Sequence, residues 1–591
     1  MSSPDEQLSA QRQLLGRKAE ICVLALVALL PFAALVRLIS DYGVNVPYGD
    51  EWTLLPLFAK CHDHQLTLAD LFRQHNEHRI VFPKLIYLAF ANWTHWNVKA
   101  EMFFSVLLAG GASAGTYFLL AQSVPGTTRK RLLLWALINL LIFAPVQAEN
   151  WLWGFQLQVF IPNLSLTGCL ALWDSRPGGM VRFGGLCLLA TVASFSFGGG
   201  LLLWPVLAFY FFLRAERARW LIAWGAGFLL VVRVYFAGYE RQPIAGPEMG
   251  NPLDYLVYFI EFLGLAVSRS SLTTGAAITA ATIGAAALLV YVALARFCWQ
   301  SARETRVAAA PWLALGAYAI CSAALAAWTR VGGGPQQALN SRYATISLNL
   351  YVGLIGLAAV AAHAARATPL QTKFSRTITS AQAPIFAAIL ALSAVSFPAA
   401  IDHMEILRRV RLDGLAHLQF AKIIGVSDKL RNALLIATPV SGLMHDVDLA
   451  DRLGLLAPPL RHSPMLQDGE NQPQRSSAEF GRFDRLAQKD GDIIEASGWC
   501  FLPDRGEPAT CVALAYKADG NWIAFALSEH RETRPDIVKE MRNRKYLGAG
   551  WRTLIHRNQL PAGATAVSAW AFDPAAGALY KLPGEFAVAA R

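Results

Sequence analysis

Runs of apolar residues long enough to cross a lipid bilayer recur along the first 400 positions of the chain. A helix rises about 1.5 Å per residue, so about 20 such residues span the hydrocarbon core. The pattern predicts about eleven transmembrane helices, over 20–39, 100–122, 131–147, 155–173, 182–197, 199–213, 220–238, 276–298, 309–328, 344–363 and 380–400. Positions 80–95 are too polar for a clear assignment, and 253–269 are predicted to lie at the membrane interface.

The pattern changes after residue 400. Positions 401–477 are mixed, with helical stretches near 403–424 and 446–455 and a proline-rich end. From 478 onward, short alternating runs such as 493–501, 511–516, 551–556 and 566–572 predict strands, and Asp519-Gly520 predicts a hairpin turn. We therefore predict a transmembrane domain over 1–400, a connector over 401–477 and a β-sandwich-like domain over 478–591. The aromatic residues of that domain fit either its core or a carbohydrate-binding surface, and the core is the safer interpretation.

Composition and charge support a membrane protein and fix its expected orientation. Of 591 residues, 54% are hydrophobic and 16% are charged, and the mean hydropathy is +0.36. These values exclude an ordinary soluble protein. The net charge of +11 indicates cytoplasmic loops rather than nucleic acid binding, because basic clusters recur in alternate loops, at 129–131, 176–182, 214–219, 303–306 and 366–376. The N-terminus is then cytoplasmic and the C-terminal domain extracytoplasmic.

The first extracytoplasmic loop, within 40–99, collects the chemistry that the other loops lack. Asp50 and Glu51 form an acidic pair, and Glu77 lies in a His-Asn-Glu-His-Arg segment that ends at Lys84. Carboxylates transfer protons, and the basic residues His78, Arg79 and Lys84 suit a phosphate. The alternative is a solvated loop whose charges only avoid the membrane.

Two further stretches fall on the same side. Glu149, Trp151, Trp153 and Gln156 fit either an interfacial aromatic belt or a sugar site, because Trp covers apolar sugar faces while polar groups bond the hydroxyls. Arg342 begins a membrane helix on the side that disfavours arginine, which a phosphate partner would explain.

No metal-ligand spacing is present, so we expect no metal at His62 and His64, although a divalent cation as cofactor remains open. Cys500 and Cys511 both lie in the C-terminal domain, where a disulfide is one option.

This arrangement resembles the GT-C class of integral-membrane glycosyltransferases. The resemblance covers roughly 20–400 and is carried by the cytoplasmic N-terminus, the first membrane helix and the acidic pair in the first outer loop, together with 75–84 and 149–158, which resemble uncharacterised bacterial members. It implies a hexosyl- or pentosyltransferase of the bacterial inner membrane, inverting in mechanism, with a polyprenyl-phosphate-linked sugar as donor and a glycan or glycolipid as acceptor. It also implies that Asp50 and Glu51 carry the catalytic carboxylate.

The residue types are consistent with this chemistry. Asp50 is the predicted base, Glu51 or Glu77 orients the acceptor, and fixed cations stabilise the phosphate leaving group. Two other classes remain open: a lipid-linked glycan polymerase, ligase or flippase, and a non-catalytic membrane scaffold for envelope assembly. We detect no internal repeat of the kind that transporters often carry.

Overall fold

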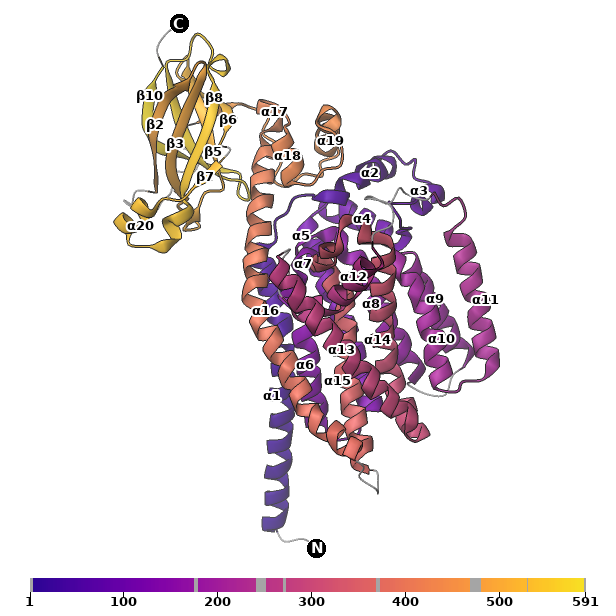
Figure 1. Ribbon diagram of the computed structural model, residues 1–591. Helices are drawn as coiled ribbons and strands as arrows, with labels where there is room; N and C mark the ends of the chain where they lie inside the picture. Colours follow the sequence, from indigo (N-terminus) through magenta and orange to yellow (C-terminus); the bar gives the residue numbers. More distant parts are fainter. Residues whose placement is uncertain are drawn as a thin grey trace. The chain divides into compact units, whose positions relative to one another are not determined.

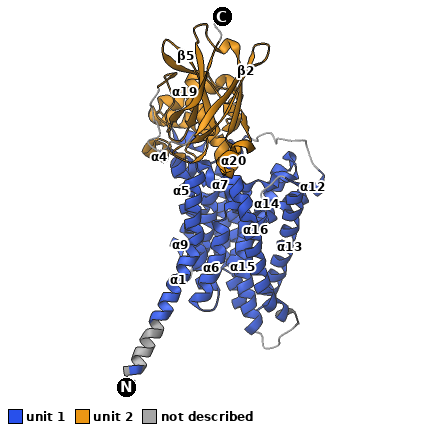
Figure 2. Cartoon of the chain, turned by 90° about the vertical axis from the view of Figure 1, so that its left-hand side faces the viewer, with its two compact units in different colours: residues 1–43, 67–89, 99–405 blue, residues 44–66, 90–98, 406–591 orange. Residues whose placement is uncertain are grey.

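The computed structural model describes residues 4–174, 179–240, 251–268, 273–367, 373–467, 480–528 and 530–588. The chain forms two compact units, coloured in Figure 2. Unit 1 comprises Met1–Gly43, Thr67–Ala89 and Lys99–Glu405, and unit 2 comprises Val44–Leu66, Phe90–Val98 and Ile406–Arg591. Parts of the predicted first loop therefore belong to the same unit as the C-terminal region. The predicted loop residue Arg176 and the predicted boundary at 477/478 lie outside the described residues.

Each of the eleven predicted apolar runs coincides with a helix. The helices are α1 (Pro4–Tyr42), α5 (Val98–Ser123), α6 (Thr128–Ile142), α8 (Leu157–Asp174), α9 (Met180–Ser194), α10 (Leu203–Leu213), α11 (Ala218–Tyr235), α13 (Thr274–Gln300), α14 (Arg303–Arg330), α15 (Ala344–Ala367) and α16 (Lys373–Gln419) (Figure 1). Within the described part of the chain, nine helical stretches are long and apolar enough to cross a membrane, and α9 and α10 belong to two shorter apolar ones.

The outer surfaces of these helices are apolar. Leu26 and Leu30 of α1 are 66% and 61% exposed, and Leu289 of α13 is 71% exposed. Large apolar surfaces of this kind require a partner, and the helix lengths point to lipid. These features indicate a membrane-embedded helical protein.

Shorter helices complete unit 1 and connect its spans. They include α3 (Leu68–Phe72), α4 (Val81–Thr94), α7 (Ala148–Leu152), α12 (Pro252–Gly264) and the 3-10 turns η2 (Pro145–Gln147), η3 (Gly154–Gln156), η4 (Gly198–Leu202), η5 (Leu265–Val267), η6 (Val331–Gly333), η7 (Pro335–Leu339) and η8 (Ser341–Tyr343). Region 80–95, left unassigned above, is α4, and the predicted interfacial segment 253–269 begins with α12.

Two packing features fix the positions of α12 and α15 within unit 1. The run from Ala344 to Ala362 in α15 is buried at every position, as expected for a central helix. Helices α12 and α13 cross at glycines: a Cβ added to Gly284 would lie 2.1 Å from the carbonyl oxygen of Ile260. This close crossing fixes α12 against the bundle.

Unit 2 contains the first-loop elements η1 (Gly49–Leu54) and α2 (Leu55–His62), the end of α16, and three connector helices, α17 (Ala421–Ile424), α18 (Asp428–Ala433) and α19 (Val440–Arg452). First loop and connector are joined by hydrogen bonds. Gly49 N donates to Leu434 O over 2.8 Å, and Asn45 Nδ2 donates to Ala457 O over 2.8 Å.

The predicted β-rich C-terminal region is confirmed. Its strands are β1 (Met465–Leu466), β2 (Gly481–Asp490), β3 (Ile493–Leu502), β4 (Glu507–Pro508), β5 (Cys511–Ala518), β6 (Asn521–Leu527), β7 (His530–Glu532), β8 (Gly550–His556), β9 (Ala566–Asp573) and β10 (Ala578–Ala587). One antiparallel sheet has the order β1-β6-β5-β9-β10, and the other has β2-β3-β8-β7 with β4 paired to β3. The remaining elements here are α20 (Pro535–Met541), η9 (Arg544–Gly548) and η10 (Arg557–Gln559).

Both faces of the first sheet are buried. Val512 and Leu514 of β5 point into the core shared by the two sheets. Cys511, Ala513 and Ala515 point to the opposite face, which packs against Ala416 and Phe420 of α16. Cys500 lies in the shared core and Cys511 on the outer face, and both thiols are free.

Candidate functional site

The segment after α3 forms a tight, rigid loop in unit 1. His75 and His78 exchange backbone hydrogen bonds of 2.8 Å in both directions, and Asn76 takes the left-handed conformation, with φ 47°, that this turn needs. Gln74 ties the loop to the chain beyond α11, because its amide donates to Glu240 O over 2.7 Å and accepts from Glu240 N. Hydrogen bonds therefore hold the predicted cluster in a defined turn.

The Arg79 side chain donates hydrogen bonds to backbone carbonyls. Its guanidinium donates to the carbonyl oxygens of Phe72 and Tyr235, and to that of Ala237 over 2.6 Å, and its side chain is buried. Satisfying three carbonyls is a structural task, because a buried unsatisfied carbonyl costs free energy. The structure thus holds this predicted phosphate ligand in the wall of unit 1.

Lys84 has a similar role at the end of α3. Its Nζ donates to the carbonyl oxygens of Asp70, Leu71 and Arg73 at 3.0, 3.1 and 2.7 Å. All three ammonium donors are therefore used. Burial, followed by the charge of nearby Arg73, lowers the pKa of Lys84 to about 8.

Glu77 and His78 point to other elements of the same unit. Glu77 Oε2 accepts from Arg330 Nη2 at the end of α14 over 2.9 Å. The imidazole of His78 packs on Phe197, with ring centroids 4.9 Å apart, and on Gly198, where an added Cβ would lie 2.6 Å from Nδ1. The loop thus brings the ends of α11 and α14 and the turn η4 to one place.

A second polar group surrounds the turn η8, where α15 begins. Glu149 Oε2 accepts from Ser341 Oγ over 2.8 Å and from the backbone N–H of Arg342 over 3.1 Å. Asn150 Nδ2 donates to Arg342 O and to Thr345 Oγ1 at 2.8 and 2.7 Å. Glu149 therefore fixes the backbone of Arg342 through its hydrogen bonds.

The Arg342 guanidinium makes no salt bridge within the described residues. Its carbon lies 5.5 Å from the centroid of the Tyr343 ring, a cation–π distance. Tyr258 of α12 lies within electrostatic reach of both Arg342 and Arg330; burial, followed by Tyr343, raises the pKa of the Tyr258 phenol, while the two arginines oppose that shift. We call Arg330, Arg342, Tyr258 and Tyr343 the arginine–tyrosine cluster. Arg330 is already paired with Glu77, so Arg342 beside phenolic donors is the cation of the cluster that suits an anionic oxygen ligand.

The aromatic stretch after Glu149 is packed inside the unit. Trp151 is fully buried, donates from Nε1 to Ala144 O over 2.9 Å and stacks on Phe160. Trp153 is 6% exposed and stacks on Phe155. Gln156 is buried and makes no side-chain hydrogen bond with any described residue. Neither indole offers an open face to a sugar, so both act as packing residues in this structure.

The acidic pair belongs to unit 2. Glu51 is fully buried, and its carboxylate accepts from the backbone N–H of Tyr48 over 2.7 Å, which caps η1. Asp50 is partly exposed, and its backbone carbonyl accepts from Thr53 Oγ1. Gly49, with φ 57°, makes the turn that separates their environments. The two carboxylates therefore differ: Glu51 stabilises the turn, and Asp50 is the one with access to solvent.

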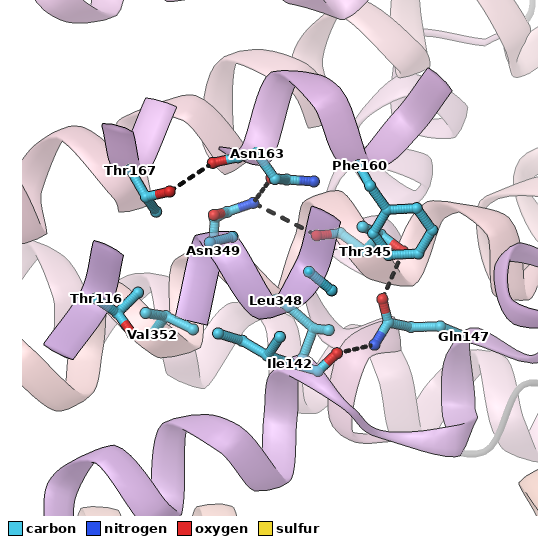
Figure 3. A pocket seen from close by; sticks show the side chains of 12 residues that line it. Thr116, Ile142, Gln147, Phe160, Asn163, Thr167, Thr345, Leu348, Asn349 and Val352 are labelled. Carbon is cyan, nitrogen blue, oxygen red and sulfur yellow. Dashed lines mark hydrogen bonds between the residues drawn. The ribbon is translucent and has the colours of Figure 1, made fainter. Parts of the chain in front are cut away.

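A small cavity lies among α5, α6, α8 and α15 of unit 1. It measures about 40 Å³, and Figure 3 shows Asn163, Asn349, Thr345 and Gln147 around it. Asn349 Nδ2 donates to Asn163 Oδ1 over 2.6 Å, and Thr345 Oγ1 donates to Gln147 Oε1 over 2.5 Å. A volume of this size suits ordered water and is far below the roughly 300–1,000 Å³ of ligand pockets.

Two members of the arginine–tyrosine cluster escaped sequence reasoning. The sequence does not single out Arg330, and nothing in it links Arg330 to Glu77. Tyr258 sits in a segment predicted to be interfacial, where a tyrosine is ordinary. No group of three or more possible metal ligands occurs among the described residues. Comparisons with known protein families, curated proteins and solved structures found no match.

Proposed function

We propose that the protein is an integral-membrane glycosyltransferase of GT-C type in the bacterial inner membrane. In this proposal α9 and α10 also cross the bilayer, the N-terminus is cytoplasmic and unit 2 is extracytoplasmic. A sugar passes from a polyprenyl-phosphate donor to a glycan or glycolipid acceptor on that outer face. Reporter fusions after Arg306 and after Arg591 are expected to report opposite sides; the same side for both would refute this orientation.

The observation that carries the proposal is the state of Arg342. Its backbone is fixed by Glu149 and Asn150, while its guanidinium makes no direct salt bridge with a described residue and has the Glu149 carboxylate only within electrostatic reach. A partly buried cation is costly unless an anion pairs with it. A phosphate on a membrane lipid carries the matching charge and reaches the start of α15 from the bilayer.

The reaction is a single displacement at the anomeric carbon. The acceptor hydroxyl oxygen forms a bond to that carbon while the bond to the phosphate oxygen breaks, and the electron pair leaves with the polyprenyl phosphate. The hydroxyl proton passes to a carboxylate base, predicted from the sequence to be Asp50, and fixed cations stabilise the leaving phosphate. A phosphate leaving group needs no general acid, so one carboxylate suffices.

The test separates binding from turnover in full-length protein reconstituted in nanodiscs. Binding of a polyprenyl phosphate is measured for Arg342→Gln and for Arg366→Gln, a matched control at the opposite end of α15. We expect Arg342→Gln to weaken binding on the order of tenfold or more and Arg366→Gln to leave it unchanged. Equal affinities for both variants would refute the site.

Turnover with a polyprenyl-phosphate sugar tests the catalytic part. Asp50→Asn is expected to lower turnover by a factor on the order of 100 to 10,000 while donor binding persists. Specific lipid binding without turnover in the wild-type protein would favour the scaffold or flippase classes instead. Near-normal turnover in Asp50→Asn together with loss in Glu77→Gln would move the base to Glu77.

A further inference from the structure

The β-rich region carries a strongly basic loop that the proposed reaction does not use. Between residues 534 and 548, five basic residues face two acidic ones, a net charge of +3. Arg534 is neutralised, because its guanidinium bonds Asp484 and Asp536. The remaining cations are exposed and make no salt bridge with described residues: Lys539, Arg542, Arg544 and Lys545. We call these four the basic loop.

The basic loop is held rigidly from its inner side. Tyr546 stacks on Phe501 with ring centroids 4.1 Å apart, and Ile537 is buried against Trp499 and Phe501. Asn543 caps η9, because its side chain accepts from Lys545 N over 3.0 Å. Packing therefore sets the conformation of this segment, while the four exposed cations make no salt bridge with described residues.

An apolar residue sits among these cations. Leu547 is 47% exposed at the end of η9. Cations that surround a protruding apolar side chain are typical of surfaces that enter the headgroup layer of an anionic membrane. Binding of a soluble polyanion would not need Leu547.

The attachment of the β-rich region to α16 is consistent with a membrane surface as the partner. Arg408 of α16 bonds Glu507 of β4 at 3.0 and 2.8 Å, and β4 packs against η9. The predicted apolar run of α16 ends at residue 400, eight residues before Arg408, which a helix covers in about 12 Å. Figure 1 shows α20 at one end of the two sheets, and α20 and η9 pack together. Contacts through β4 thus link the basic loop to α16 at a position eight residues beyond its predicted apolar run.

We propose that the basic loop docks onto the anionic lipid headgroups of the membrane in which α16 is embedded. Each cation near such a surface adds to the attraction, which falls off within a Debye length of roughly 8 Å at physiological salt. Docking would restrain the β-rich region at the bilayer surface. The inference rests on membrane insertion of α16 and not on the proposed reaction.

Hydrogen exchange of the full-length protein in nanodiscs tests the docking. Peptides that cover 539–548 are compared in zwitterionic discs and in discs that contain phosphatidylglycerol, with β2 peptides as the internal reference. We expect slower exchange of the 539–548 amides in the anionic discs only, and loss of that protection at high salt. Equal exchange in both lipid compositions would overturn the proposal.

Paired charge reversals identify the residues responsible. Arg544→Glu with Lys545→Glu is expected to abolish the lipid-dependent protection. Arg482→Glu with Arg485→Glu removes two exposed cations from β2 of the same region and is expected to retain it. Protection lost equally in both variants would indicate a general charge effect. Protection conferred by added anionic polysaccharide in zwitterionic discs, and not by anionic lipid, would assign the loop to a glycan instead; either result refutes lipid docking.

Discussion

Two basic segments of unit 1 use the same residue types for opposite purposes. In the loop from His75 to Lys84, the cations Arg79 and Lys84 donate to six backbone carbonyls. In the turn from Ser341 to Tyr343, neighbouring residues hold the backbone, and the Arg342 side chain makes no direct salt bridge with a described residue. A cation whose donors already serve the fold has less to offer a ligand. The second segment is therefore the better candidate for phosphate, although the first is richer in charge.

The largest expected effect comes from removing Arg79. Arg79→Met leaves the buried carbonyl of Tyr235 and the partly buried carbonyls of Phe72 and Ala237 without a donor, and a fully buried one costs about 1–3 kcal/mol. We expect the free energy of unfolding to fall by about 3 kcal/mol or more, measured by thermal unfolding in detergent. Arg342→Met, the matched variant in the other segment, is expected to stay near the wild-type value. If Arg342→Met were less stable than Arg79→Met, the structural role assigned to Arg79 and not to Arg342 would be wrong.

Lys84 adds a pH dependence to the first segment. Its pKa is lowered from 10.5 to about 8, so between these values the unfolded chain binds more protons than the folded protein. Stability is then expected to rise as pH increases from about 8 to 10.5, by up to about 3 kcal/mol. The measurement is the unfolding midpoint against pH, with Lys84→Met as the variant that lacks this rise. A fall in stability attributable to Lys84 over that range would contradict the shift.

Variants of Glu149 test whether the position of Arg342 in the second segment matters for phosphate binding. Glu149→Ala removes the acceptor that fixes Ser341 and Arg342, so we expect polyprenyl phosphate affinity to drop about tenfold through misplacement of Arg342. Glu149→Gln keeps an acceptor oxygen and is expected to restore part of the affinity. Equal loss in both variants would mean that the carboxylate charge matters more than its hydrogen bonds.

The smallest effect is expected at Glu77. Its pair with Arg330 is 39% and 36% exposed, and exposed pairs contribute about 0–1 kcal/mol. Glu77→Gln is therefore expected to change unfolding stability by less than about 1 kcal/mol and to leave the His75–His78 turn intact. A larger loss of stability would place Glu77 among the structural residues of the loop.

The fold was largely predictable because its main signals are local. Apolar runs marked all eleven helices, and Asp519-Gly520 marked the β5–β6 hairpin, whose left-handed residues have φ 49° and 82°. The division into units was not predictable. Residues 44–66 join unit 2 through hydrogen bonds to Leu434 and Ala457, which lie about 400 positions away and carry no matching pattern.

The site was predictable only in residue type. The sequence shows that Arg79, Lys84 and Arg342 are cations beside a membrane. It does not show that Arg79 and Lys84 donate their hydrogen bonds to backbone carbonyls at the ends of α3 and α11. Trp151 and Trp153 are aromatic residues in a polar stretch, and only packing shows that both are buried. The assignment of the four C-terminal tryptophans to the core is confirmed, since Trp499, Trp522, Trp551 and Trp570 are each 2–3% exposed.

The placement of Cys500 and Cys511 makes the β-rich region indifferent to redox conditions. Their thiols face opposite sides of the sheet that contains β5, so its backbone stands between them and they cannot form a disulfide with each other in this fold. Burial raises the pKa of each thiol to about 12, which suppresses the thiolate that exchange and oxidation require. An oxidising periplasm and a reducing cytosol should therefore yield the same folded region, without a disulfide isomerase.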